Sequence, residues 1–170
     1  MTPAVWRIFN RRPFPHSSAA PRWLQRHRQL SAGVVTPAAV MDFIRAKWAD
    51  VPGGSGLTCT EISPHHAIMQ CRVPMHDIRP GGFISGPAQF ALCDVAMWAA
   101  VFGAKGLDEM AMTSEMSIRF LRPALGDELT ARVDTLSVGT RQIVMQAKVF
   151  TDNADKPTVL AQGTYVMPKG

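Results

Sequence analysis

The chain has 170 residues, 46% of them hydrophobic, which supports one domain with a substantial core and excludes two full-sized domains. Its net charge of +5 is concentrated at the start, because residues 1–31 contain six arginines and no acid. The remaining 12 basic side chains, six fewer than the total of 18, nearly balance the 13 acidic ones. A body of that charge lacks the basic face that nucleic acid requires, so we expect no nucleic-acid partner.

Residues 1–31 are predicted to be a basic, flexible extension, and residues 32–170 to form the folded domain. The extension contains scattered prolines and lacks the apolar core of a secretory signal. A transit peptide, an arm that binds phosphate groups, translated sequence upstream of the true start and simple disorder all stay open as explanations.

The cysteines favour a reducing compartment. Cys59, Cys71 and Cys93 are odd in number and have no C-x-x-C spacing, which argues against a disulfide framework or a zinc site. We therefore expect a cytoplasmic protein with no metal and no cofactor. The longest apolar run, 90–102, is shorter than the roughly 18 to 20 residues of a membrane span, so it predicts a core helix and no membrane span.

The first predicted elements are a helix and a hairpin. Thr36-Pro37 is a helix cap followed by a first-turn proline, and apolar residues at helical spacing predict a helix over 37–49. Two short strand-like runs follow at 57–62 and 66–73, separated by Ser63-Pro64. A loop at 74–82 then leads to the apolar helix.

Strands dominate the second half of the sequence. After Gly103 the period changes, because apolar and polar residues alternate over 113–120 as in a half-buried strand. Runs rich in Val, Thr and Leu predict three more strands, at 128–136, 141–151 and 158–167. This order predicts an α+β protein with a single domain, in which an antiparallel sheet wraps around one long central helix.

The segment 80–103 carries the strongest functional signal. Ser85 suits the helix cap, Gly86 allows a ligand to approach the backbone, and Pro87 suits the first helical position. The free N–H groups at such a helix start can stabilise negative charge that develops on a reacting oxygen. Asp94 is a single acid among apolar helix neighbours, and we expect it to be buried and kept for chemistry.

Gly86 and Asp94 are too far apart to act together within one chain. Eight residues separate them, which is about 12 Å along a helix axis. If both serve one reacting centre, they come from two helices, most simply from the two copies in a symmetric dimer. We therefore expect a homodimer or a dimer of dimers.

Two motifs resemble a known family. The first is G-x-x-S-G-P-x(6)-D-x-A-M, ending at Met97, and the second is I-R-F-L-R-P-A-x-G-D, over 118–127. Together with the order of the elements, they resemble the hotdog-fold thioesterases of the phenylacetate-type (PaaI-like) group over about 37–167. This chain has Ser85-Gly86-Pro87 where the family has His-Gly-Gly.

The resemblance implies hydrolysis of an acyl-CoA thioester to a free acid and CoA. By this resemblance Asp94 is the general base that activates water, or a nucleophile that forms a mixed anhydride, and the Gly86 amide forms the oxyanion hole. Thr113 resembles the hydroxyl residue that helps to position the attacking water. Ser85 occupies the place of the family's histidine, and Arg79 that of an asparagine that contacts the substrate carbonyl.

Further residues are predicted to bind the substrate. Packing of Phe90 and Trp98 is expected to set the depth of the acyl pocket. CoA phosphates need cations at the pocket rim. The candidates are Arg122, in the second motif, Arg141 and, as a further option, Lys105.

Two other functions stay open. A hotdog dimer that binds acyl-CoA without cleaving it would be a sensor or carrier, which the Ser-Gly-Pro sequence permits. A hotdog dehydratase would pair a loop histidine with the helix acid, and His76 lies 18 residues before Asp94, a longer gap than the dehydratase pattern has.

Overall fold

The computed structural model describes residues 35–48 and 56–167, and the statements below concern these ranges. The predicted extension over residues 1–31 lies outside them and stays a prediction.

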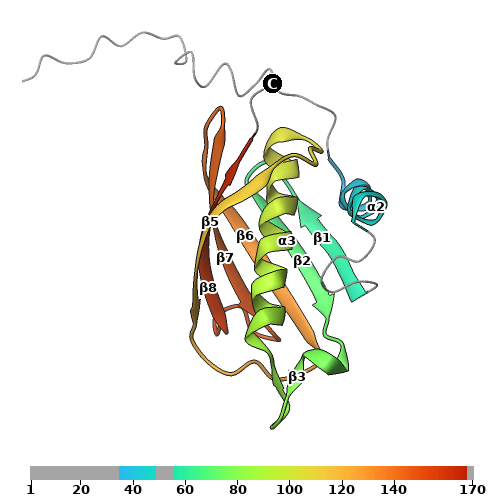
Figure 1. The fold of residues 1–170 in the computed structure, drawn as a ribbon, viewed down its shortest axis with the longest axis vertical. Coiled ribbons are helices and arrows are strands. Elements are labelled where there is room, and N and C mark those ends of the chain that lie inside the picture. Colours follow the sequence, from blue (N-terminus) through green and yellow to red (C-terminus); the bar gives the residue numbers. More distant parts are fainter. Residues whose placement is uncertain (1–34, 49–55, 168–170) are drawn as a thin grey trace, which may run out of the picture. The chain divides into compact units, whose positions relative to one another are not determined.

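A six-stranded antiparallel sheet forms the body of the domain, in the spatial order β1-β2-β6-β7-β8-β5 (Figure 1). The strands are β1 (Leu57–Ile62), β2 (His66–Arg72), β5 (Met112–Phe120), β6 (Glu128–Val138), β7 (Gln142–Phe150) and β8 (Val159–Val166). The predicted strands are confirmed, with ends that differ by a few residues. Alternate residues of β7 and β8 are buried, as the period of 2 requires when one face of a sheet is covered.

The long helix α3 (Gly86–Lys105) lies across this covered face (Figure 1). The Ser85 side chain caps it by accepting a hydrogen bond from the Ala88 N–H at 3.2 Å. Gly86 is the first helical residue and Pro87 the second, one position later than predicted. At the other end Gly106, with φ of 93°, ends the helix in a conformation that side chains rarely adopt.

The core consists of the inner face of the sheet and most of α3. Its largest fully buried side chains include Phe102, Met97, Met69 and Met145. By length and composition alone α3 could cross a membrane, but 61% of its most apolar window is buried inside the protein. The predicted α+β architecture, a sheet around a central core helix, is therefore confirmed.

Shorter elements complete the domain. Helix α2 (Pro37–Lys47) packs beside β1 (Figure 1), and Thr36 caps it as predicted by accepting from the Ala39 N–H at 3.2 Å. The loop predicted between β2 and α3 contains a short helix, η2 (Met75–Asp77). A hairpin follows, made of two strands of two residues each, β3 (Ile78–Arg79) and β4 (Phe83–Ile84).

Candidate functional site

The start of α3 is held by buried polar contacts. Gln89, only 4% exposed, donates to the carbonyl oxygens of Ile84 and Ser85 at 3.4 Å. The Thr158 hydroxyl in turn donates to the Gln89 side-chain oxygen at 2.8 Å. These bonds join the Ser85-Gly86 turn to the sheet. The first N–H groups of any helix lack intrahelical acceptors, and fixing this turn keeps them in place for a bound oxyanion.

Asp94 lies at the middle of α3 and is half-buried. Its Oδ1 atom accepts hydrogen bonds from the Thr113 hydroxyl at 2.7 Å and from the Tyr165 hydroxyl at 2.7 Å. The expected burial of Asp94 is therefore partial, and two hydroxyl groups contact it in addition to its apolar helix neighbours. Two hydroxyl donors hold Oδ1 in place, so the geometry suits a proton acceptor at a fixed position.

Thr113 reaches Asp94 because β5 contains a bulge. The strand's register with β8 shifts between Thr113, opposite Tyr165, and Glu115, opposite Thr164. A bulge inserts an unpaired residue, here Ser114, and changes the face on which the next side chains lie. Thr113 consequently contacts the central helix while Glu115 lies on the other face of the sheet, although simple alternation predicted that they share a face.

An open cleft of about 640 Å³ runs beside Asp94. Of the predicted site residues, Asp94, Thr113 and Trp98 line it. The remaining wall comes from α2, α3, the segment before β5 and β8, through Lys47, Trp48, Val95, Glu109, Met110, Ala111, Met112 and Tyr165. Most of these side chains are apolar, which suits the acyl part of a substrate with the carboxylate beside it.

Tyr165 is the residue that sequence reasoning missed. It is the only tyrosine of the chain and is 3% exposed, and burial together with the nearby Asp94 charge raises its pKa. In the sequence Tyr165 is simply one residue of a predicted strand, and no local pattern connects it to Asp94, 71 positions earlier. The chemical signal was available in principle, because a buried tyrosine hydroxyl normally needs a hydrogen-bond partner.

The other predicted residues do not line this cleft within one protomer. Ser85 and Gly86 lie at the start of α3, two helical turns before Asp94. Phe90 is 41% exposed and does not line this cleft in the protomer, and its place in the acyl pocket stays a prediction. Arg122 and Arg141 are exposed, as is Arg79 on β3. Within residues 35–48 and 56–167, no acid pairs with these three arginines.

The cysteines and His76 contribute nothing to the cleft. All three cysteines are free thiols, and burial raises the pKa of Cys59 to about 11 and that of Cys93 to about 12. Cys93 is fully buried beside Asp94, so the interpretation that it fills the core is confirmed. The His76 side chain is 81% exposed, and its Nε2 lies 3.9 Å from Asp77.

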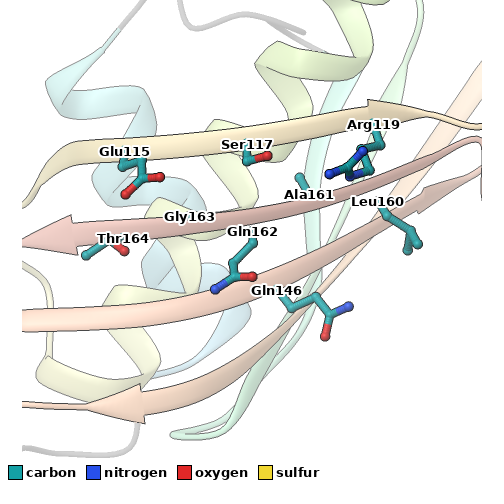
Figure 2. Close-up of a pocket in the computed structure, with 9 residues that line it drawn as sticks. All are labelled: Glu115, Ser117, Arg119, Gln146, Leu160, Ala161, Gln162, Gly163 and Thr164. Carbon is teal, nitrogen blue, oxygen red and sulfur yellow. The ribbon is translucent and has the colours of Figure 1, made fainter.

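A second, more polar depression lies on the opposite face of the sheet. It measures about 370 Å³ and is formed by side chains of β5, β7 and β8, among them Glu115, Arg119 and Gln162 (Figure 2). None of the predicted site residues lines it, so the cleft beside Asp94 is the better candidate for catalysis.

Apolar side chains are exposed near the start of α3. Phe83 pairs with Leu125 through an isolated β-bridge, and these side chains are 38% and 55% exposed. The Phe120 ring, 52% exposed, lies 3.4 Å from the place where a Cβ on Gly86 would be. Strand β5 is also an edge of the sheet, so its outer hydrogen-bonding groups have no partner strand within residues 35–48 and 56–167. An apolar surface beside an open strand edge is typical of an interface.

Comparisons with known proteins agree with this architecture. Residues 81–158 match the thioesterase superfamily. A conserved protein of Pseudomonas aeruginosa is 26% identical, with a TM-score of 0.64 over 74% of this chain and 96% of its own. No curated protein matches the sequence.

Two further solved structures share the fold at lower identity. A mutant of the phenylacetic acid degradation protein PaaI from Thermus thermophilus is 21% identical, with a TM-score of 0.58 over 75% of this chain and 99% of its own. A hypothetical thioesterase protein of Streptococcus pneumoniae, solved with coenzyme A, is 22% identical, with a TM-score of 0.63 over 76% and 97%. The predicted hotdog fold is confirmed.

Proposed function

We propose that this chain, which has the hotdog fold and matches the thioesterase superfamily over residues 81–158, hydrolyses an acyl-CoA thioester to a free acid and CoA. The observation that carries the proposal is Asp94, a half-buried carboxylate that lines an apolar cleft and is oriented through one oxygen atom. That arrangement suits a general base, which needs an accessible acceptor atom at a fixed position.

In the proposed reaction, Asp94 removes a proton from water as the water oxygen attacks the thioester carbonyl. The carbonyl oxygen becomes negative and is stabilised by the N–H of Gly86. When this intermediate collapses, the carbon–sulfur bond breaks, and the thiolate of CoA leaves and takes up the proton held by Asp94. Direct attack by the carboxylate, which gives a mixed anhydride that water then cleaves, is the alternative route.

A second copy of the chain completes the proposed site. Gly86 and Asp94 belong to the same helix, and eight residues correspond to about 12 Å along its axis. One carbonyl can therefore contact Asp94 of one protomer and Gly86 of the partner subunit, but not both groups of one protomer. The exposed edge of β5 and the apolar residues around Phe120 supply the surface for that second copy.

Substrate binding divides between the cleft and the arginines. The acyl group occupies the apolar cleft beside Trp98, and the phosphates of CoA bind exposed cations. Arg122 and Arg141 remain the candidates, and the structure adds that neither is already paired with an acid within residues 35–48 and 56–167. Coenzyme A in the structure of the Streptococcus pneumoniae protein supports this substrate class.

Release of free thiol from a panel of aryl, short and medium acyl-CoAs tests the proposal. The parent protein should cleave at least one of them, and Asp94→Asn should lower kcat by a factor of about 10² to 10⁴. The asparagine keeps an oxygen that accepts from Thr113 and Tyr165, so the fold should be unchanged in circular dichroism.

The panel also separates the competing functions. Tight binding of an acyl-CoA without thiol release would identify a sensor or carrier and overturn the hydrolase proposal. Equal turnover by the parent and the Asp94→Asn variant would reject the carboxylate as the base. Hydration of an enoyl-CoA without thiol release would identify a dehydratase.

A further inference from the structure

The inference concerns how Asp94 is held, and it rests on the proposed function. Tyr165 is buried near the end of β8, and its hydroxyl oxygen lies 2.7 Å from Asp94 Oδ1 and 2.8 Å from the Asp94 backbone oxygen. A tyrosine hydroxyl has one proton to donate, so these two acceptors on one residue share it. Tyr165 therefore fixes the carboxylate relative to its own backbone.

Thr113 and Tyr165 act on the same oxygen because they are directly opposite each other on β5 and β8. The bulge after Thr113 brings its side chain to the helix-facing side of the sheet, where its hydroxyl also donates to Oδ1 at 2.7 Å. Within residues 35–48 and 56–167 no hydrogen bond to Oδ2 is formed. The two oxygens of Asp94 consequently differ, since Oδ1 is held by two donors and Oδ2 is free.

The packing of α3 on β8 agrees with this contact. The Met97 side chain of α3 reaches Gly163, two residues before Tyr165, where a Cβ would lie 2.6 Å from Met97 Sδ. Side chains two residues apart in a strand lie on the same face, which places Tyr165 beneath the helix as well.

We propose that Tyr165 is a positioning residue for thioester hydrolysis, which keeps Oδ1 of Asp94 fixed so that Oδ2 alone accepts the proton from water. The Thr113 hydroxyl also holds Oδ1, because it donates a hydrogen bond to that atom. Its oxygen can at the same time accept a hydrogen bond from the attacking water, through the proton that Asp94 does not remove. Tyr165 itself contacts no reacting atom. Its effect on the reaction passes entirely through the carboxylate.

Few titratable side chains lie near Asp94 in the described part of the chain. Lys47 from α2 and Glu109 from the segment before β5 line the same cleft and form an ion pair of 2.5 Å. Burial raises the pKa of Tyr165 and of Cys93, the adjacent thiol on α3, so both stay protonated at neutral pH. On β5, Thr113 is uncharged and Glu115 lies on the opposite face.

The first test compares kcat and KM of the parent and of Tyr165→Phe at neutral pH. The variant keeps the ring and loses a hydrogen-bond donor to the carboxylate, so kcat should fall about 10-fold while KM stays within about twofold. A loss confined to kcat marks an interaction that acts in the transition state. An unchanged kcat, or a rise in KM as large as the fall in kcat, would overturn the inference.

The matched control is Thr135→Val, which also removes one hydroxyl. The Thr135 hydroxyl is buried without a hydrogen-bond partner in the described part of the chain and does not line the cleft. This variant should keep the parent's kcat and KM. If Thr135→Val and Tyr165→Phe lower kcat equally, the Tyr165 effect is a general loss of packing and the positioning role is rejected.

A second readout is independent of activity. Because the chain contains one tyrosine, the tyrosine doublet in its ultraviolet resonance Raman spectrum reports only the Tyr165 hydroxyl. At neutral pH the doublet should have the intensity ratio of a strong hydrogen-bond donor, and this signature should be lost in Asp94→Ala. A parent that shows the donor signature but cleaves no thioester would reject the proposed function. A parent that cleaves thioesters without that signature would reject the inference alone.

Discussion

Gly103 of α3 packs directly against the backbone carbonyl of Ser63, in the turn between β1 and β2, so closely that a Cβ on Gly103 would overlap the carbonyl oxygen. Replacing a helical glycine by alanine ordinarily stabilises a helix by about 1 kcal/mol. Here the obstacle is backbone, which cannot rotate away as a side chain does, so overpacking of about 1 to 3 kcal/mol is added. We expect Gly103→Ala to lower the free energy of unfolding, measured by urea titration. A more stable variant would contradict the contact.

Two substitutions of Thr113 should lower kcat by different amounts. Thr113→Ala removes one of the two donors to Asp94 Oδ1 and leaves Tyr165 in place, so kcat should fall about 10-fold, less than in Asp94→Asn. Thr113→Ser keeps the hydroxyl and should restore most of kcat. The thiol-release assay compares the three variants. Equal losses in Thr113→Ala and Thr113→Ser would mean that the methyl group, and not the hydroxyl, matters.

Mixed dimers test whether two copies share a site. Gly86→Pro removes the N–H that would bind the oxyanion, and the extended Ser85 backbone, with φ of −66° and ψ of 152°, accommodates a following proline. Each of Gly86→Pro and Asp94→Asn should be inactive alone. After unfolding and refolding together in equal amounts, half the dimers are mixed with one intact site each, so about a quarter of the parent's activity should return. No recovery, with mixed dimers verified by affinity tags, would reject the shared site.

Trp48 offers a test of acyl selection. It lies at the end of α2, is 40% exposed and packs against Trp98 at a ring distance of 6.3 Å. Trp48→Ala should raise KM for the preferred acyl chain about 10-fold by removing apolar contact area, with kcat nearly unchanged. The control is Leu136→Ala, which removes apolar atoms from an exposed residue outside the cleft and should leave KM unaltered.

The three cysteine thiols should not react with a thiol reagent in the native protein. Burial raises the pKa of Cys59 to about 11 and of Cys93 to about 12, and that of Cys71 also lies above its usual value. Since the thiolate is the reactive form, a thiol reagent at pH 8 should detect almost no protein thiol until denaturant is added. Three thiols per chain should then appear. Rapid reaction of the folded protein would show that these side chains are accessible.

Sequence patterns predicted the elements well because their signals are local. Thr36 and Ser85 begin helices through contacts three residues away, and the strand-like composition over 128–136 can be read from that segment alone. The contact between Tyr165 and Asp94 was not predictable in that way, since it joins residues 71 positions apart. The bulge after Thr113 changes the face of one side chain without any proline or glycine to mark it.

The residues that line the cleft come from two kinds of structural element. Its outer wall comes from the end of α2 and from the segment before β5, whereas Asp94, Thr113 and Tyr165 belong to the central helix and two long strands. Loops and helix ends tolerate sequence change more readily than packed strands do. Under the proposed function, substitutions in this wall can change which acyl group is accepted while Asp94, Thr113 and Tyr165 stay in place. Among related sequences, acyl preference should therefore vary more than the residues that carry out the proton transfer.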